Sequence, residues 1–282
     1  MINLLKMDLY RMFKNRVTWL CILGTVILMI SSVFLTSSDI NYYSSHQEEL
    51  KQIEANRDRS EDWGIYIGSV MPEWCKDIEA PVVALIANNI QSKMLLLFLV
   101  VLLVDFVNGE NKTGFLLNIV GQISNRGYII VSKVIITAIF SFIQLLSTCV
   151  IIGISSQLFL GYTNFEGISN FLPFISMQLL LQIAFGTLII FIVTFTKSTI
   201  ASMVIGILLS SGIIQVLDPI FRAILNKSKE FSIMYYTISG NIGQLRIGSS
   251  KDVYLRSFFI VILVLMITSY ISIYLIRKRD VE

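Results

Sequence analysis

Apolar runs long enough to cross a lipid bilayer constrain this chain more than any other feature of its sequence. The runs at residues 129–155, 171–195 and 258–276 each reach the roughly 18 residues that a hydrocarbon core of about 30 Å requires. Only 15% of the 282 residues are charged, against about 25% in a typical soluble domain. Backbone groups in lipid must bond within their own segment, and these runs lack the alternation of barrel strands. The sequence therefore predicts an all-α integral membrane protein that crosses the membrane several times.

The hydropathy pattern divides the chain into six expected membrane-spanning helices within one domain, residues 1–282. We expect them at residues 17–36, about 85–107, 129–155, 171–195, 199–217 and 258–276. Cations gather before the first span and after the last: Lys6, Arg11, Lys14, Arg16, Arg277, Lys278 and Arg279. Since short loops rich in Lys and Arg stay in the cytoplasm, both termini are expected inside.

Residues 1–16 precede the first span and show an amphipathic helical pattern. Ile2, Leu5 and Leu9 fall on one side of a helical wheel, while Asp8 and Arg11 fall on the other. This pattern predicts a helix lying in the membrane interface. The alternative is a cytoplasmic extension of the first span.

Two long polar stretches are expected on the outer side. Residues 39–83 are rich in acidic side chains and form an extracellular insertion, either a solvated helical loop or a receptor for a cationic substrate. Residues 218–257 are too interrupted to cross the bilayer but apolar enough to enter it. We expect short re-entrant outer helices there, with a plain surface loop as the alternative.

The second span carries polar side chains toward its outer end, namely Asn88, Asn89, Gln91 and Lys93. Polar groups at that depth should face protein or water and not lipid. They form a possible substrate vestibule, or they simply extend to the interface, and the sequence leaves both open. Asp105, near the inner end of the same span, is either a polar anchor or a proton-relay group.

Catalytic and metal-binding patterns are missing from the sequence. The one histidine, His46, falls in the expected outer loop, and no span carries a paired-carboxylate or zinc motif. Residues 109–113 end like a phosphate-binding loop but lack its upstream glycine. We predict no catalytic residue, no metal site, no cofactor bound by this chain and no nucleic-acid partner, because the cations form no basic stripe.

The connection between the second and third spans, residues 108–128, holds the best candidates for contact with a soluble partner. The candidate residues are Glu110, Lys112, Thr113, Gly114, Phe115, Leu116, Ile119, Arg126 and Lys133. An apolar turn flanked by charges suits docking into a partner's groove. The alternative is an amphipathic turn that merely lies in the interface.

Together with the Arg11–Arg16 stretch and the basic ending, these short motifs resemble the ABC-2-type permeases, the six-span membrane subunits of bacterial ABC exporters. The resemblance implies a multi-pass protein of the bacterial plasma membrane, paired with a second, identical or homologous permease. It also implies a cytoplasmic ABC ATPase that uses ATP and Mg²⁺, with residues 108–128 as the coupling segment. Within that family, size and the lack of a fused ATPase resemble the permeases of bacitracin and lantibiotic immunity, which implies export of antimicrobial peptides or other amphipathic or lipid-linked substrates. The alternative function is a membrane-anchored sensor that captures a ligand with residues 39–83.

Overall fold

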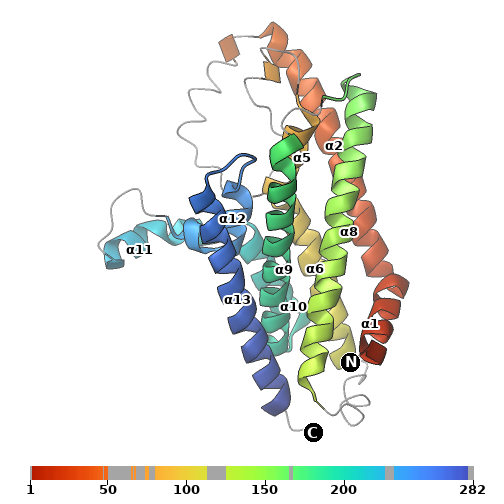
Figure 1. The fold of residues 1–282 in the computed structure, drawn as a ribbon, viewed down its shortest axis with the longest axis vertical. Coiled ribbons are helices and arrows are strands. Elements are labelled where there is room, and N and C mark those ends of the chain that lie inside the picture. Colours follow the sequence, from red (N-terminus) through yellow and green to blue (C-terminus); the bar gives the residue numbers. More distant parts are fainter. Residues whose placement is uncertain are drawn as a thin grey trace.

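The computed structural model describes residues 2–46, 48–49, 65, 67, 74–75, 80–112, 125–164, 168–225 and 232–278. Within these ranges every regular element is a helix. The long helices form an elongated bundle, with the N-terminus and the end of the last helix at the same end (Figure 1). We call this the terminal end and the opposite one the distal end.

Four single helices of the described chain are long and apolar enough to cross a membrane. They are α2 (Arg16–Ser45), α8 (Gly127–Phe159), α9 (Phe171–Thr196, extended by the short helix η1, Ile168–Asn170) and α13 (Lys251–Lys278). A bent pair of helices adds a fifth candidate span. The expected all-α fold is confirmed for the described residues. Four or five of the helices are long and apolar enough to cross a membrane, as expected of a multi-pass membrane protein.

The bent pair consists of α5 (Val82–Gln91) and α6 (Met94–Lys112), whose axes differ by 50°. Lys93 lies at the break with a φ of 64°, the left-handed region that residues other than glycine seldom adopt. Helix α5 is buried on all sides by the rest of the bundle. The second expected span is therefore a broken helix whose distal half lies inside the protein.

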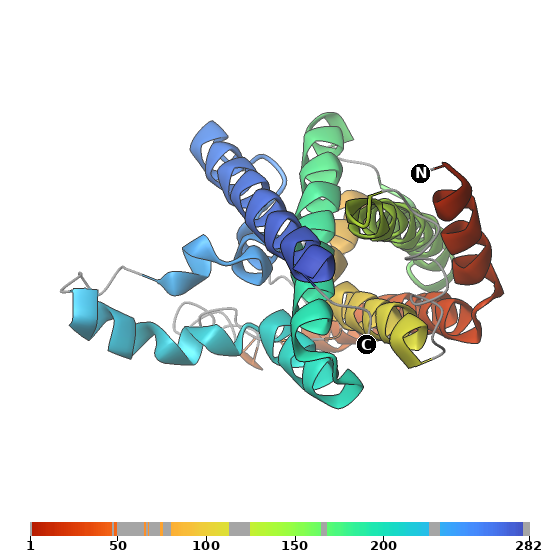
Figure 2. The ribbon, with the colours of Figure 1, turned by 90° about the horizontal axis from the view of Figure 1, so that it is seen from below.

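The bundle is organised around α9, the most buried of the four single-helix candidate spans. It packs against α6, α8, α10, α12 and α13, and in the view along the bundle it separates α1, α2, α6 and α8 from α11 and α12 (Figure 2). Gly186 allows this close packing, because a Cβ there would lie 2.2 Å from Cγ2 of Thr137 on α8.

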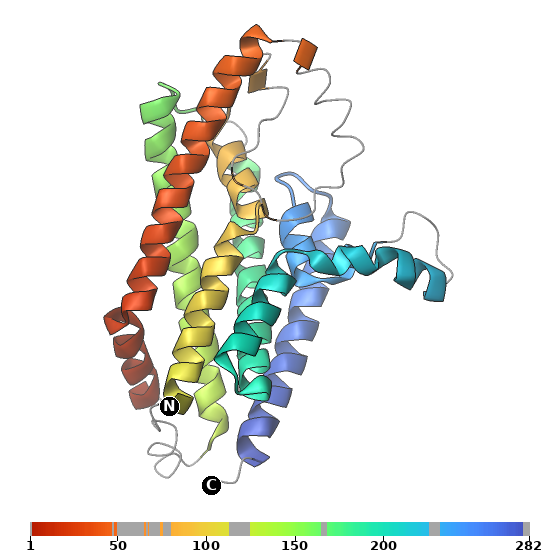
Figure 3. The same cartoon turned by 180° about the vertical axis from the view of Figure 1, so that it is seen from behind.

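The helix expected over residues 199–217 is shorter in the structure. Helix α10 covers Thr199–Ser210, or about 18 Å at 1.5 Å per residue, well short of a bilayer core. Gly212 then turns the chain with a φ of 74°. The 3₁₀ helix η2 (Ile213–Leu217) and α11 (Asp218–Leu225) follow and leave the bundle sideways (Figure 3). The continuous fifth span expected from hydropathy alone is thus replaced by a short helix and a turn.

The remaining distal elements are the 3₁₀ helix η3 (Ile233–Tyr236) and α12 (Ile238–Gln244). Two buried glutamines hold α12 in the bundle. Gln178 of α9 donates to the backbone oxygen of Ile242 over 3.0 Å, and Gln91 of α5 donates to that of Leu245 over 2.7 Å. In the described part of the expected outer segment 218–257, short helices precede the start of α13 at Lys251, and α12 is packed into the interior.

The N-terminal helix α1 spans Ile2–Lys14 and packs on α8 and α2 at the terminal end. The expected helix is present, but the face that it buries does not coincide with the apolar face that a helical wheel predicts. Asp8, on the polar side of the helix, is among its most buried residues, whereas apolar Ile2 is exposed. Most of the expected 39–83 insertion lies outside the described residues, apart from the end of α2 and a few short pieces.

Candidate functional site at the terminal end

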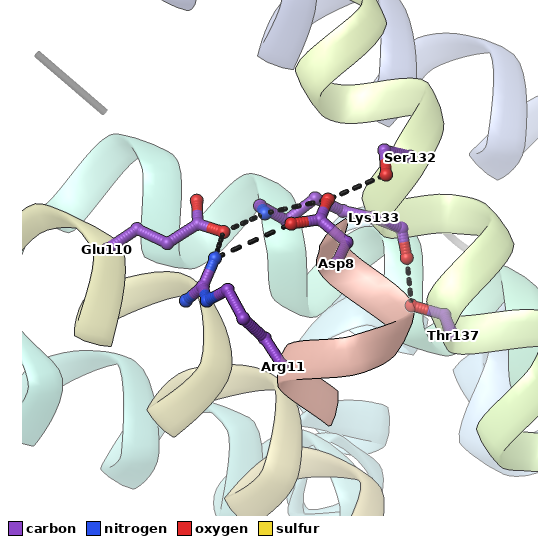
Figure 4. Close-up of polar contacts among 6 residues, drawn as sticks. All are labelled: Asp8, Arg11, Glu110, Ser132, Lys133 and Thr137. Atoms are coloured by element: carbon purple, nitrogen blue, oxygen red, sulfur yellow. Dashed lines mark hydrogen bonds and ion pairs between the residues drawn. The ribbon is translucent and has the colours of Figure 1, made fainter. Parts of the chain in front are cut away.

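Four charged side chains from three helices meet at the terminal end of the bundle (Figure 4). They are Asp8 and Arg11 of α1, Glu110 of α6 and Lys133 of α8, and we call them the ion cluster. Two carboxylates and two cations balance within the cluster. It joins the N-terminal helix to both helices that flank the 113–124 connection.

Asp8 accepts contacts from two directions. Its Oδ2 accepts a hydrogen bond from the Ser132 hydroxyl over 2.6 Å and lies 3.6 Å from Nζ of Lys133. Its Oδ1 lies 3.4 Å from Arg11, one turn further along α1. Because Ser132 and Lys133 are neighbours on α8, a single aspartate fixes the rotation of α1 against that helix.

Glu110 is the centre of the cluster. Its Oε1 accepts hydrogen bonds from both Arg11 and Lys133, and its side chain is 1% exposed. One turn earlier on α6, the ring of Phe106 lies 4.9 Å from the guanidinium carbon of Arg11 and 4.9 Å from Nζ of Lys133. The aromatic face offers both cations a further favourable electrostatic contact.

Burial makes the cluster sensitive to the loss of any one member. Asp8, Glu110 and Lys133 are all buried, while Arg11 keeps 26% of its side chain exposed. A buried ion pair gains little net stability over apolar packing, but removing one partner strands the other charge in a poorly solvated place. The cluster therefore specifies one arrangement of α1, α6 and α8 and resists their separation.

A second polar contact ties the start of α2 to α6. Asn15 donates from Nδ2 to Oδ2 of Asp105 on α6 over 2.9 Å, and its Oδ1 accepts from the backbone N–H of Val17. The asparagine thus caps the start of α2 while holding α6. Asp105 therefore accepts a hydrogen bond from the residue that caps the start of α2.

The structure separates the predicted coupling residues into two groups. Glu110 and Lys133 are brought together in the ion cluster, and Arg126 lies half-buried immediately before α8. Lys112 is the last residue of α6. Thr113, Gly114, Phe115, Leu116 and Ile119 lie outside the described residues. Glu110, expected at the rim of a docking surface, instead faces the interior.

The four predicted vestibule residues lie inside the bundle. Asn88, Asn89, Gln91 and Lys93 are all buried. Asn89 donates to the backbone oxygen of Leu85, and Gln91 to that of Leu245. They face protein, as polar groups at that depth should, so a vestibule would require α5 or α12 to move.

Sequence reasoning did not assign Asp8 or Arg11 to a site with Glu110. One signal was available: Asp8 is the only acidic residue in a segment otherwise rich in cations. Its pairing with Ser132 and Lys133, more than 120 positions away, has no local signature. Only the packing of α1 on α8 reveals it.

The contacts of this site are ion pairs and hydrogen bonds that join helices. Among the described residues no three His, Cys, Asp or Glu side chains gather as a metal ion would require. The cluster's charged groups face one another and not a cleft. The cluster joins α1, α6 and α8 at the two helix ends from which the 113–124 connection starts.

Comparison with models of known protein families and with curated proteins gives no match to this chain. The function must therefore be argued from the bundle, the ion cluster and the short motifs.

Proposed function

We propose that this chain is the membrane-spanning permease subunit of an ATP-driven exporter of the ABC-2 type. The observation that supports this most is the position of the ion cluster. Glu110 and Lys133 flank the 113–124 connection and are joined through Asp8 and Arg11 to α1. A partner pressing on that connection would move three helices as one rigid body.

In this proposal the terminal end faces the cytoplasm of a bacterial cell. The N-terminal cations and the Arg277–Arg279 ending then obey the positive-inside rule. Helix α10, η2 and α11 then stand in place of the fifth of six spans. The chain enters the membrane from the inside along α10 and turns sideways partway across it. Helices α11 and α12 would be the re-entrant outer helices.

The energy source in this proposal is a separate cytoplasmic ABC ATPase, which binds ATP and Mg²⁺. Phe115, Leu116 and Ile119 would supply the apolar contact with it, and Lys112, Thr113, Gly114 and Arg126 its polar surroundings. A second permease, identical or homologous, would complete the assembly. The cargo would be an antimicrobial peptide or another amphipathic or lipid-linked molecule expelled from the membrane, reaching Asn88, Asn89, Gln91 and Lys93 when the distal half opens.

The coupling proposal is tested by purifying the full chain from its native host together with any soluble ATPase that remains bound. Replacing Glu110 by Gln or Phe115 by Ala should lower cargo-stimulated ATP hydrolysis, and Glu49→Gln, at the exposed distal end, serves as the matched control. Normal binding and normal coupling in both variants would contradict the proposal. Loss of function on deleting residues 45–75, with a tolerant 113–124 connection, would favour a membrane-anchored sensor instead.

The orientation is tested with single cysteines introduced after Cys21, Cys75 and Cys149 are replaced by serine. Lys14 and Glu49 are both exposed but lie at opposite ends of the bundle. A membrane-impermeant maleimide added to intact cells should label Glu49→Cys and leave Lys14→Cys unlabelled until the cells are opened. The reverse pattern would contradict the proposed topology.

A further inference from the structure

A cavity of about 230 Å³ opens on the side of the bundle where α10 ends partway along it. Phe185 and Leu188 of α9 form its back, Leu209 of α10 one side, and Val264 and Ile267 of α13 the other. Residues of η3 and α12 close the cavity toward the distal end. The cavity exists because the chain turns away at Gly212 instead of continuing as a full spanning helix.

The two threonine hydroxyls of the lining are already engaged with the protein. The Thr268 hydroxyl donates to the backbone oxygen of Val264, and the Thr237 hydroxyl donates to that of Met234 while accepting from the backbone N–H of Gly240. What remains for a ligand is mainly aliphatic and aromatic surface. Apolar cavities of this kind stay dry, and an engineered one of roughly 150 Å³ binds benzene.

The opening of the cavity lies on an exposed apolar surface of a candidate membrane-spanning helix. Leu263 and Ile267 of α13, both in the lining, are 57% and 50% exposed. Large apolar side chains this exposed on a candidate spanning helix are suited to contact with hydrocarbon. A ligand arriving through this opening must therefore be a hydrocarbon chain already in the bilayer.

A cation lies on the same face of α13, nearer the distal end. Arg256 precedes Leu263 by seven residues and Ile267 by eleven, so the three side chains lie on one face of α13. Along the helix axis, Arg256 lies about 10 Å from Leu263. Its guanidinium carbon lies 4.6 Å from the ring centre of Tyr235, beside Tyr236 of the cavity lining. Its Nε atom is buried and has no hydrogen-bond partner in the described part of the chain. Guanidinium groups bind phosphate with charge-assisted hydrogen bonds.

We propose that this face of α9, α10 and α13 binds one phospholipid of the surrounding bilayer. One acyl chain occupies the cavity beside Val264, and the phosphate of the headgroup contacts Arg256. The lipid completes the side of the bundle that α10 leaves uncovered. This site is separate from the proposed export function and needs no ATPase to be tested.

The test uses the full chain in lipid nanodiscs with a phosphatidylglycerol that carries a photoreactive diazirine midway along one acyl chain. Labelling of the peptides lining the cavity is measured by mass spectrometry. Labelling around Leu23 and Ile27, exposed apolar residues of α2, serves as the internal standard for bulk lipid and for intact folding. A diacylglycerol probe with the same photoreactive chain and no phosphate forms the second arm.

Val264→Phe fills the cavity, and Met266→Phe is the matched control because Met266 is 65% exposed and lies outside the lining. We expect Val264→Phe to reduce cavity labelling about tenfold relative to α2, and Met266→Phe to leave it unchanged. Equal labelling in the two variants would overturn the proposal. Arg256→Gln should weaken labelling by the phospholipid but not by diacylglycerol, and an equal response to both probes would overturn the headgroup contact.

Discussion

The two ends of the bundle are held together by different kinds of polar contact. At the terminal end, four charged side chains form the ion cluster that joins α1, α6 and α8. At the distal end, α12 is held by the neutral amides of Gln91 and Gln178, which donate to backbone oxygens. Ser257 of α13 adds a hydrogen bond of 2.9 Å to Asn241.

These contacts differ in what it costs to break them. Separating a buried ion pair strands a charge, whereas a neutral side-chain hydrogen bond within a membrane protein contributes only about 0.6 kcal/mol on average. The terminal end should therefore move as one body, while α12 can release and re-form its contacts. This difference is compatible with the proposed function, in which a partner displaces the terminal end and α12 moves at the distal end.

The largest expected effect comes from removing the cation shared by both carboxylates. Lys133→Ala should lower the free energy of unfolding by about 3–5 kcal/mol, because Asp8 and Glu110 then share only the partly exposed Arg11. Reversible unfolding in mixed micelles measures this change. Lys14→Ala, an exposed lysine of the same region, is the control and should have no effect. A similar free energy of unfolding in both variants would show that the ion cluster does not hold the terminal end more firmly than the distal end is held.

Close packing one turn above the ion cluster gives the next largest effect. Gly186→Ala should cost about 1–3 kcal/mol, because the new Cβ would lie 2.2 Å from Thr137 and 3.1 Å from Leu103. Gly153→Ala on α8 is the matched control, since nothing lies within 4 Å of its Cβ position. The same unfolding measurement compares them, and an equal response would show that α8 and α9 do not pack this tightly.

A double-mutant cycle sharpens the account of the cluster itself. Glu110→Gln and Lys133→Gln should each be destabilising, and the double variant should recover about 0.5–3 kcal/mol relative to the sum, as coupled neighbours do. The neutral pair keeps the shape of the site without an uncompensated charge. Strict additivity of the two unfolding free energies would mean that the two side chains do not interact.

The smallest effect is expected at the distal end. Gln178→Leu should cost no more than about 0.6–1.7 kcal/mol, the range of side-chain hydrogen bonds measured within membranes. Ser176→Ala, an exposed position on the same helix, provides the baseline. A loss as large as that of Lys133→Ala would mean that α12 is held as firmly as the ion cluster.

Much of the architecture could be predicted from the sequence because lipid imposes simple rules. The spans at 17–36, 129–155, 171–195 and 258–276 each fall within one long helix, since continuous apolar runs have no other way to satisfy their backbone. The run at 199–217 was less informative. Hydropathy depends only on which residues are present, whereas the positive φ of Gly212 determines where α10 ends.

The candidate site was only partly accessible to sequence reasoning. Glu110 and Lys133 attracted attention as charges near span ends, but the sequence suggested that they face a partner. Their burial depends on Asp8 and Arg11, which reach them through the packing of α1 against α8. A pairing across so many intervening residues leaves no periodic pattern. For Asn88 and Asn89 the sequence predicted contact with protein or water, and the structure buries both within α5.

Distances between spin labels test most directly whether the terminal end moves as one body while the distal end opens. The first pair of labels, at Lys6→Cys and Tyr128→Cys, reports the distance between α1 and α8. The second pair, at Arg246→Cys and Leu172→Cys, reports the distance between the chain just after α12 and the start of α9. All four positions are exposed. Both distances are measured in the complex with the ATPase proposed above, before and after ATP is trapped. The account predicts an unchanged distance for the first pair and a shifted one for the second. A change in the first pair with a constant second pair would contradict it.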